Sequence, residues 1–345
     1  MSIFMQDILS QVNHVENALN YYFSPRCLDI LDKISKMNYS IIIFTGMGSS
    51  HYASISASLF LNENKINSIV MSASQLLHYS LNIVDNKTLL IVVSQSGESA
   101  EMINLLYKIG DRANVIGIIN NPDSALARMV KYNLFLNVEN EVSVSSRTYI
   151  ATLVVTSLLA RYLVHNEKEC RAEFIGALES LKLFLEDYKN RLNDIDIFLK
   201  DVKFISCIGR GPSYASAMAS SLFLKEAAKF PSEGMDSAEF RHGPIEIVDE
   251  SFGAIVFAPE GRTGTLGLKI ASDIAIKGGK VILMTDQERA IESANITVFK
   301  YKYVDEYMAP IVEVAGSQLL CVSAAKKTGV IPGEFRCASK VTKNE

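Results

Sequence analysis

The sequence contains no tryptophan and has few cysteines for its 345 residues. No two cysteines form a Cys-x-x-Cys pair, which argues against a zinc knuckle and against a redox dithiol. An odd number of cysteines scattered along a long chain also argues against a disulfide scaffold. We expect these thiols to be buried or unreactive in a reducing cytosol. The five cysteines are Cys27, Cys170, Cys207, Cys321 and Cys337.

Basic clusters and long apolar runs are missing as well. The formal net charge is −4, with no basic stripe or polybasic tail, so we expect no nucleic-acid partner. No run reaches the roughly 18 apolar residues that span a membrane. Residues 1–10 lack a charged region followed by an apolar one, so no secretory signal is expected. We therefore expect a cytoplasmic protein without a membrane partner, and its mild acidity is compatible with a small anionic substrate.

The histidines show no metal-ligand spacing. No His-x-x-x-His pair is present, and no carboxylates cluster at the spacing of zinc ligands. We therefore expect neither a metal nor another cofactor. The five histidines are His14, His51, His78, His165 and His242.

Short apolar runs alternate with longer amphipathic stretches in the first half of the chain. Residues 41–44, 89–93 and 115–119 are continuous apolar runs, which are typical of strands buried on both faces. Residues 53–62 and 98–108 read as helices between them. This alternation predicts an α/β fold with a parallel sheet.

The second half repeats this pattern. Residues 204–208, 254–258 and 281–284 are again apolar runs of strand length. The offset between equivalent landmarks is 163 residues from Gly46 to Gly209 and 166 residues from Val115 to Val281. A nearly constant offset between landmarks in the same order indicates two copies of one α/β domain.

The remaining segments read as helices, apart from a C-terminal loop that contains Pro332-Gly333. Two long helices are expected over residues 148–197, and a closing helix over residues 307–328. The predicted organisation is a helical arm over residues 1–37, a first domain over 38–165, a linking helix over 166–199, a second domain over 200–330 and a C-terminal tail over 331–345.

Two loops of the first copy follow strands, where open parallel sheets bind their ligands. Gly46-Met47-Gly48-Ser49-Ser50 is the first of them. Its glycines permit a tight turn, and the free amides at a helix start attract anions. The loop lacks the Gly-x-x-x-x-Gly-Lys pattern of a nucleotide-binding loop. A plain strand-to-helix turn is the open alternative.

The second loop is Ser94-Gln95-Ser96-Gly97-Glu98-Ser99. Three hydroxyls and an amide surround a glycine at the positive end of a predicted helix. Serine hydroxyls and backbone amides together can surround a phosphate without a lysine. Capping the helix would need only one serine, so the loop has more hydroxyls than that structural role requires.

The same six residues resemble the phosphosugar signature of the sugar isomerase (SIS) domain family, Ser-Gln-Ser-Gly-Glu-[Ser/Thr]. The resemblance covers nearly the whole chain as two tandem SIS domains, and it is strongest to the isomerase half of glucosamine-6-phosphate synthase and its stand-alone relatives. It implies an α/β fold in which each domain is a flavodoxin-like parallel sheet between layers of helices. Three further motifs carry it: Gly209-Arg210-Gly211, Leu224-Lys225-Glu226 and Glu239-Phe240-Arg241-His242-Gly243-Pro244.

The resemblance implies two catalytic roles in the second copy. Glu226 would be the base that moves a proton between C1 and C2, which suits a carboxylate whose pKa is raised by partial desolvation. His242 would open the sugar ring, and in the family this histidine reaches the site of a neighbouring subunit, which implies a homodimer. By composition alone, Glu226 would be a solvated helix residue and His242 a helix-end residue.

The resemblance also implies a binding site for a phosphorylated sugar. The loops after the apolar runs 41–44 and 89–93 would line the pocket and hold the phosphate, and a Glu-x-x-Val-x-Ser segment beginning at Glu141 would lie over the sugar. The implied binding residues are Gly48, Ser49, Ser50, Ser94, Gln95, Ser96, Ser99, Val144 and Ser146.

The chain departs from the synthase pattern in three places. Met1 is not followed by cysteine, so no glutaminase domain is expected. Phe223 stands where the synthase helix has a lysine, and Ala219 replaces an acidic residue; an apolar ring neither transfers protons nor pairs with a phosphate. Ser339 stands at the position of the synthase Schiff-base lysine, and Lys340 follows it.

Two features resemble the fructosamine-6-phosphate deglycase branch instead, namely Glu246 and the Lys340-Val341 ending. Lys340 would still be able to form an imine with a keto sugar. A solvated C-terminal lysine is the alternative.

The leading hypothesis is a phosphosugar isomerase that acts on a hexose or aminohexose 6-phosphate by proton transfer between C1 and C2. The alternative is an aminosugar-6-phosphate deaminase or a fructosamine-6-phosphate deglycase. A non-catalytic phosphosugar sensor is less favoured, because both Glu226 and His242 are kept. No helix-turn-helix segment or basic arm points to a DNA-binding regulator.

Overall fold

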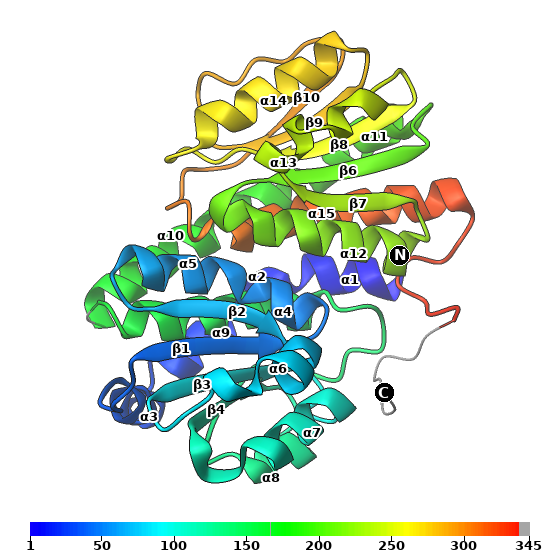
Figure 1. The fold of residues 1–345 in the computed structure, drawn as a ribbon. Coiled ribbons are helices and arrows are strands. Elements are labelled where there is room, and N and C mark those ends of the chain that lie inside the picture. The colour runs from blue at the N-terminus through cyan, green and yellow to red at the C-terminus, as the bar shows by residue number, and fades with distance from the viewer. Residues whose placement is uncertain (166, 338–345) are drawn as a thin grey trace. The chain divides into compact units, whose positions relative to one another are not determined.

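The computed structural model describes residues 1–165 and 167–337. Contacts between Cα atoms divide the chain into two compact units. The first unit is built on Asn13–Ala172, and the second unit on Met1–Val12 with Glu173–Arg336. Each unit contains one five-stranded parallel sheet (Figure 1).

The sheet of the first unit has the strand order β2-β1-β3-β4-β5. Strand β2 lies on one side of β1, and β3, β4 and β5 follow on the other side, so the strand order reverses between β1 and β3. This is the flavodoxin-like order. Gly46 at the end of β1 lies opposite Ser72 of β2 and Val93 of β3. The strands are β1 (Ile41–Gly46), β2 (Ser68–Ser72), β3 (Thr88–Ser94), β4 (Asn114–Ile119) and β5 (Tyr132–Phe135).

Helices cover both faces of this sheet. Side chains of α6, α7 and α8 pack with Ile43, Leu90 and Val92 in one apolar core. Helices α4, α5 and α9 pack on the other face, which gives three layers (Figure 1). The helices are α2 (Gln11–Tyr22), α3 (Pro25–Ser35), α4 (Ser49–Ala53), α5 (Ile55–Glu63), α6 (Ala73–Tyr79), α7 (Ala100–Ile109), α8 (Ala125–Met129) and α9 (Arg147–Tyr162), with short 3₁₀ turns at Leu81–Ile83 and Gly110–Arg112.

The sheet of the second unit repeats this topology, with the order β10-β9-β8-β6-β7. Its reversal lies between β6 and β8, where Ile208 is opposite Val256. Both sheets are thus parallel and doubly wound, and the predicted fold class is confirmed. The strands are β6 (Phe204–Gly209), β7 (Ser232–Asp236), β8 (Phe252–Phe257), β9 (Lys280–Thr285) and β10 (Ile296–Lys300).

Helices α13 and α14 pack on one face of the second sheet and α11 and α12 on the other, with α15 packed against α12. Three helices, not the predicted two, follow residue 147, because the chain breaks again at Asp187 (φ −94°, ψ 15°). The helices are α1 (Ile3–Leu9), α10 (Glu167–Glu186), α11 (Tyr188–Leu199), α12 (Tyr214–Ala228), α13 (Ser237–Arg241), α14 (Gly264–Ile276) and α15 (Ala309–Thr328), with 3₁₀ turns at Gly211–Ser213 and Pro244–Ile247.

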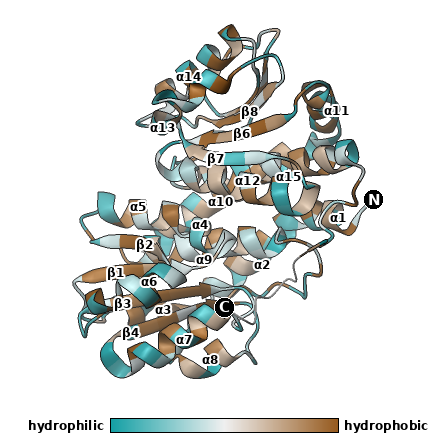
Figure 2. Cartoon of the chain, turned by 45° about the vertical axis from the view of Figure 1, so that its right-hand side comes forward, coloured by the Kyte–Doolittle hydropathy of each residue, from teal (hydrophilic) through white to brown (hydrophobic). Residues whose placement is uncertain are grey.

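The central strands carry the apolar core. All seven residues of β3 and all six of β8 are buried, as expected for strands covered on both faces. Figure 2 shows the hydrophobic colour along β1, β3 and β4 and along β6 and β8. Within residues 1–165 and 167–337, no helix is both long and apolar enough to cross a membrane.

Candidate functional site

The two loops singled out in the sequence leave neighbouring strands at the same edge of the first sheet. Gly46 ends β1 opposite Val93, and Ser94 is the last residue of β3. Helix α4 then covers one face of the sheet and α7 the other, so the loops diverge at the reversal of strand order (Figure 1). This topological switch point is where doubly wound sheets bind ligands.

The serine loop is locked by its own hydroxyl oxygens. Ser94 Oγ accepts a hydrogen bond from the Gly97 amide at 3.1 Å, and Ser96 Oγ accepts one from the Glu98 amide at 3.2 Å. Because a hydroxyl also carries one donor hydrogen, both serines can still donate to an anion. Ser99 begins α7 without a side-chain capping bond, and the first amides of a helix have no intrahelical acceptor.

Gly97 fits tightly within this loop. Its φ is +67°, and a Cβ atom there would lie 2.2 Å from Ser124 Oγ. The next residue, Glu98, accepts a hydrogen bond from the Ala125 amide at 2.8 Å, which ties the loop to the start of α8. The donor groups of the loop are therefore fixed in place before a ligand arrives, which reduces the ordering cost of binding.

The glycine loop turns directly into α4. Gly48 has φ +53°, and a Cβ atom on Gly46 would lie 3.0 Å from the carbonyl oxygen of Val93. The close approach of β1 and β3 therefore requires glycine at position 46. Ser49 and Ser50 form the first turn of α4 and are partly exposed.

His51 is held on the side of β1 away from β3. Burial lowers the pKa of its imidazole, and a hydrogen bond to the Met71 backbone in β2 acts in the opposite direction. The ring is therefore neutral at physiological pH and makes a structural contact with β2.

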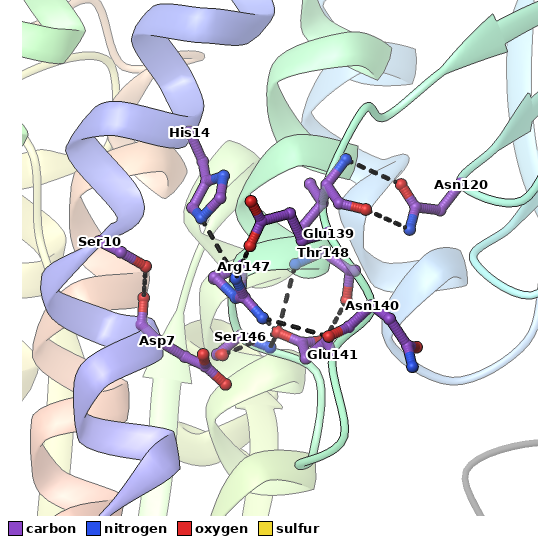
Figure 3. Close-up of polar contacts among 11 residues, drawn as sticks. Asp7, Ser10, His14, Asn120, Glu139, Asn140, Glu141, Ser146, Arg147 and Thr148 are labelled. Carbon is purple, nitrogen blue, oxygen red and sulfur yellow. Dashed lines mark hydrogen bonds and ion pairs between the residues drawn. The ribbon is translucent and has the colours of Figure 1, made fainter. Parts of the chain in front are cut away.

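Val144 and Ser146 belong to a loop organised by the Glu141 carboxylate (Figure 3). Glu141 is 1% exposed, and its Oε1 accepts hydrogen bonds from Ser146 N at 3.0 Å, Ser146 Oγ at 2.9 Å and Arg147 N at 2.7 Å. The carboxylate thus satisfies free amides at the positive end of α9. Ser146 donates its hydroxyl hydrogen to Glu141, which leaves its oxygen as an acceptor.

Glu226 lies in the last turn of α12, in the second unit. Burial raises the pKa of its carboxyl, and the charges of Lys229 and Lys225 lower it. A half-buried carboxyl with a raised pKa is suited to giving and taking a proton near neutral pH. Phe223, on the same helix, is fully buried in the apolar core.

His242 follows α13 in an exposed segment of the second unit. Its backbone amide donates to Glu239 O at 2.9 Å, and Gly243 then turns the chain with φ +132°. Asp236 caps α13 through the Ala238 amide at 2.7 Å, which fixes the position of this segment on the unit. Glu246 is exposed in the following 3₁₀ turn.

The structure brings the two predicted loops of the first unit to one edge of its sheet. The glycine loop and the serine loop meet at the first switch point, while Glu226 and His242 belong to the second unit. That the two groups complete one site is a prediction. Ser339 and Lys340 lie outside the described residues. The described parts of the chain contain no group of three or more His, Cys, Asp or Glu side chains arranged to hold a metal.

Sequence reasoning missed Glu313 of α15, which is fully buried. Ser213 and Ser216 donate hydrogen bonds to it at 2.8 and 2.5 Å, and burial raises its pKa to about 7. The only charged residue in the mostly apolar stretch 309–325 was the signal that could have found it.

The SIS domain family model matches residues 34–162 and 198–325. The chain is 28% identical over 344 residues to glutamine–fructose-6-phosphate aminotransferase (isomerizing) of Pyrococcus horikoshii, with 97% of this chain and 56% of that protein covered. The chain therefore spans about half the length of the curated relatives it matches.

Two solved structures share its fold. Glucosamine-6-phosphate deaminase from Thermotoga maritima aligns with a TM-score of 0.78 at 18% identity and 98% coverage of both chains. Tagatose-6-phosphate ketose/aldose isomerase from Escherichia coli aligns with a TM-score of 0.79 at 17% identity, covering 96% of this chain and 95% of that one.

Proposed function

Because the chain belongs to the SIS domain family, we propose that it is an aldose–ketose isomerase of a hexose or aminohexose 6-phosphate. The observation that carries this proposal is the preorganised loop Ser94–Ser99 at the β1–β3 switch point. The names of its relatives and structural neighbours, which include sugar-phosphate isomerases and a deaminase, support the same class of chemistry.

The phosphate would be bound by Ser94, Ser96 and Ser99 together with the first amides of α7. The serine oxygens already accept backbone amides in two cases, so their hydrogens are available to the phosphate. The positive end of the α7 dipole also attracts an anion and so favours phosphate binding. Gln95, Gly48, Ser49 and Ser50 would contact the sugar, and Ser146 and Val144 would cover it.

Glu226 would carry out the proton transfer. As a carboxylate it removes the proton on the carbon next to the carbonyl while the carbonyl oxygen takes up a proton, which leaves an enediol with a double bond between C1 and C2. The protonated Glu226 then returns its proton to the former carbonyl carbon while the hydroxyl on the other carbon loses its proton. The product is the isomeric carbonyl compound, and no net oxidation occurs. His242 would shuttle the proton that opens the ring, in the neighbouring subunit of a homodimer.

A deaminase or deglycase is the second candidate. Phe223 is buried and apolar at the position where the synthase pattern has a lysine, so proton handling near Glu226 differs from that pattern. Glu226 would move a proton between C1 and C2 in the same way, and water would then hydrolyse the resulting imine, so that the amine leaves and a carbonyl group remains. Lys340 would form an imine with the keto sugar in either case. A sensor without turnover would have no need of a half-buried Glu226 with a raised pKa.

The remaining parts of the proposal concern the whole chain. The two SIS domains would span residues 38–165 and 200–330, with a helical arm over 1–37, a linker over 166–199 and a tail over 331–345 that closes the active site. The protein would act in the cytoplasm, without nucleic acid, membrane or cofactor.

Product analysis tests the reaction class. The protein is incubated with fructose 6-phosphate, glucosamine 6-phosphate and a fructosamine 6-phosphate, and products are identified by NMR with ammonia measured alongside. An aldose–ketose mixture without ammonia is expected. Ammonia or a free amine would move the assignment to the second candidate, and binding without turnover of any of the three would contradict an enzyme.

Substitution of Ser96 by alanine tests the phosphate site. A hydrogen bond to a charged group contributes about 1.5–3 kcal/mol, so we expect S96A to weaken fructose 6-phosphate binding by roughly 10-fold or more. Calorimetric titration measures this, with the exposed Ser35→Ala in α3 as the control. Equal affinity of S96A and wild type, or equal affinity for fructose and its phosphate, would place the phosphate elsewhere.

A further inference from the structure

Lys229 ends α12 in the left-handed backbone conformation, with φ 52° and ψ 33°. This conformation is unfavourable for a residue with a Cβ atom, and glycine is the usual residue at this point of a helix. Lysine nevertheless occupies this position. A residue in an unfavourable backbone conformation is a reason to ask what its side chain does.

The Lys229 ammonium joins the last turn of α12 to the segment that follows α15. Its Nζ donates to the carbonyl oxygen of Glu226 at 2.5 Å and to the carbonyl oxygen of Glu334. Two neighbouring bonds reinforce this junction. The Gly333 amide donates to Ala227 O at 3.1 Å, and Thr328 Oγ1 donates to Ala228 O at 2.7 Å.

The same ammonium acts on the Glu226 carboxyl. Burial raises the pKa of Glu226, and the charge of Lys229 lowers this pKa more than the charge of Lys225 does. Lys225 is directed toward Ser221 Oγ, at 2.8 Å, and Ser232 O, at 3.4 Å. Lys229 is therefore the main cation that offsets the desolvation of this carboxylate.

The other elements packed against this turn bring few titratable groups. From α15 comes the Cys321 thiol, whose pKa is raised well above its usual value by burial, so that it stays neutral. Glu233 on β7 and the segment residues Glu334 and Arg336 are exposed to solvent.

We propose that Lys229 is a positioning residue for Glu226: it fixes the last turn of α12 against residues 331–336 and stabilises the negative charge of the Glu226 carboxylate. The inference rests on the proposed role of Glu226 in proton transfer. It explains why lysine, and not glycine, occupies a left-handed position three residues after that glutamate.

Replacing Lys229 by glycine removes its charge without adding backbone strain. Lys229→Gly relieves the left-handed conformation, so the fold is expected to persist, but it removes the ammonium. With that charge gone, Glu226 holds its proton more tightly. The acid limb of the pH–rate profile for hydrogen exchange at C1/C2 therefore moves to higher pH, and the rate at a pH on that limb falls by about threefold or more.

Lys65 provides the matched control. It also has a left-handed backbone, with φ 63°, and it is exposed in the first unit. Lys65→Gly should leave the pH–rate profile unchanged, and Lys229→Arg, which keeps the charge, should restore it. Lys229→Asn, which tolerates the same backbone, replaces the glycine variant if that variant does not fold.

Titration of the Glu226 side chain by carboxyl-carbon NMR tests the inference without any substrate. The midpoint should be higher in Lys229→Gly than in wild type. An unchanged midpoint would overturn the inference and leave the proposed function standing. A raised midpoint in a protein that exchanges no hydrogen with any sugar phosphate would contradict the proposed function, while the electrostatic link between Lys229 and Glu226 would hold.

Discussion

Two buried glutamates of the second unit show how burial changes the chemistry of a single residue. Glu226 keeps partial access to solvent, and the charges of Lys229 and Lys225 lower its pKa. Glu313 is fully buried, accepts hydrogen bonds from Ser213 and Ser216, and has no cation among the influences on its pKa. The first is suited to proton transfer, while the second ties the start of α12 to α15.

Glu313 should make the stability of the protein depend on pH. Burial raises its pKa from 4.5 to about 7 in the folded state, so the folded state binds the proton more tightly than the unfolded state. Its contribution is fully present below pH 4.5 and is lost as the pH rises through about 7. The free energy of unfolding should fall by roughly 3 kcal/mol over that range.

Glu313→Gln tests this dependence, because glutamine fills the same volume and does not titrate. Urea unfolding of wild type and variant at pH 5 and pH 8 measures the difference. The wild type should lose stability between the two values, and the variant should lose less. An identical decline in both proteins would show that other groups cause it.

At the level of single residues, the sequence was informative where several residues of one chemical type gathered. The three serines of Ser94–Ser99 exceed what a helix cap needs, and the structure leaves the Ser99 side chain without a capping bond. The role of Glu141 was not predictable, since its carboxylate bonds depend on how residues 141–148 fold back on it. His51 likewise required knowledge of where β2 lies.

At the level of elements, the serine loop and α7 act together, and Gly97 joins them. Gly97→Ala should weaken sugar-phosphate binding by about 10-fold or more, because the new methyl group would displace Ser124 and distort the loop. It should also destabilise the protein by about 1–3 kcal/mol. Titration calorimetry and urea unfolding measure the two effects.

Gly110→Ala is the matched control for this substitution. Gly110 ends the same helix with φ +54°, but a Cβ atom there would meet nothing within 4 Å. Its backbone (φ 54°, ψ −132°) is unfavourable for alanine, so the control should lose about 1–3 kcal/mol of stability and keep its affinity for the sugar phosphate. If both variants bind as wild type does, the loop does not hold the ligand.

The central strands were predictable and the edge strands were not. β1, β3, β4, β6, β8 and β9 are continuous apolar runs, because helices cover both of their faces. β2 and β7 are mostly half-buried, with sequences such as Ser-Glu-Gly-Met-Asp that carry no strand periodicity. The break between α10 and α11 at Asp187 also has no glycine or proline to mark it.

At the level of the whole molecule, two copies of one fold have diverged in their loops. The loop after β8, Ala258–Thr263, has lost the serines of its counterpart, and its amides are already bonded to the protein's own carboxylates. Glu260 N donates to Asp286 Oδ1 at 2.6 Å, and Arg262 N donates to Glu306 Oε2 at 3.2 Å. A phosphate at the second switch point would meet two negative charges, which favours the first sheet as the binding site.

The nearly constant offset between the copies indicated this duplication in the sequence. The alternation of apolar runs and helical stretches predicted the parallel sheet in each copy. The division of the chain into two compact units was harder to predict. Residues 1–12 pack with the second unit, although most of that unit begins at Glu173, and no local pattern indicates this pairing. Long-range packing of this kind depends on the whole fold and not on the periodicity of one segment.

Hydrogen exchange in D₂O tests the central claim that Glu226 moves a proton between C1 and C2 of a sugar phosphate. Wild type and Glu226→Gln are incubated with fructose 6-phosphate and with glucosamine 6-phosphate, and NMR follows deuterium at both carbons. Glu233→Gln, at an exposed glutamate of the same unit, is the matched control. We expect deuterium incorporation by wild type and the control, and a loss of about 100-fold or more in Glu226→Gln. Incorporation by Glu226→Gln at the wild-type rate would contradict the account.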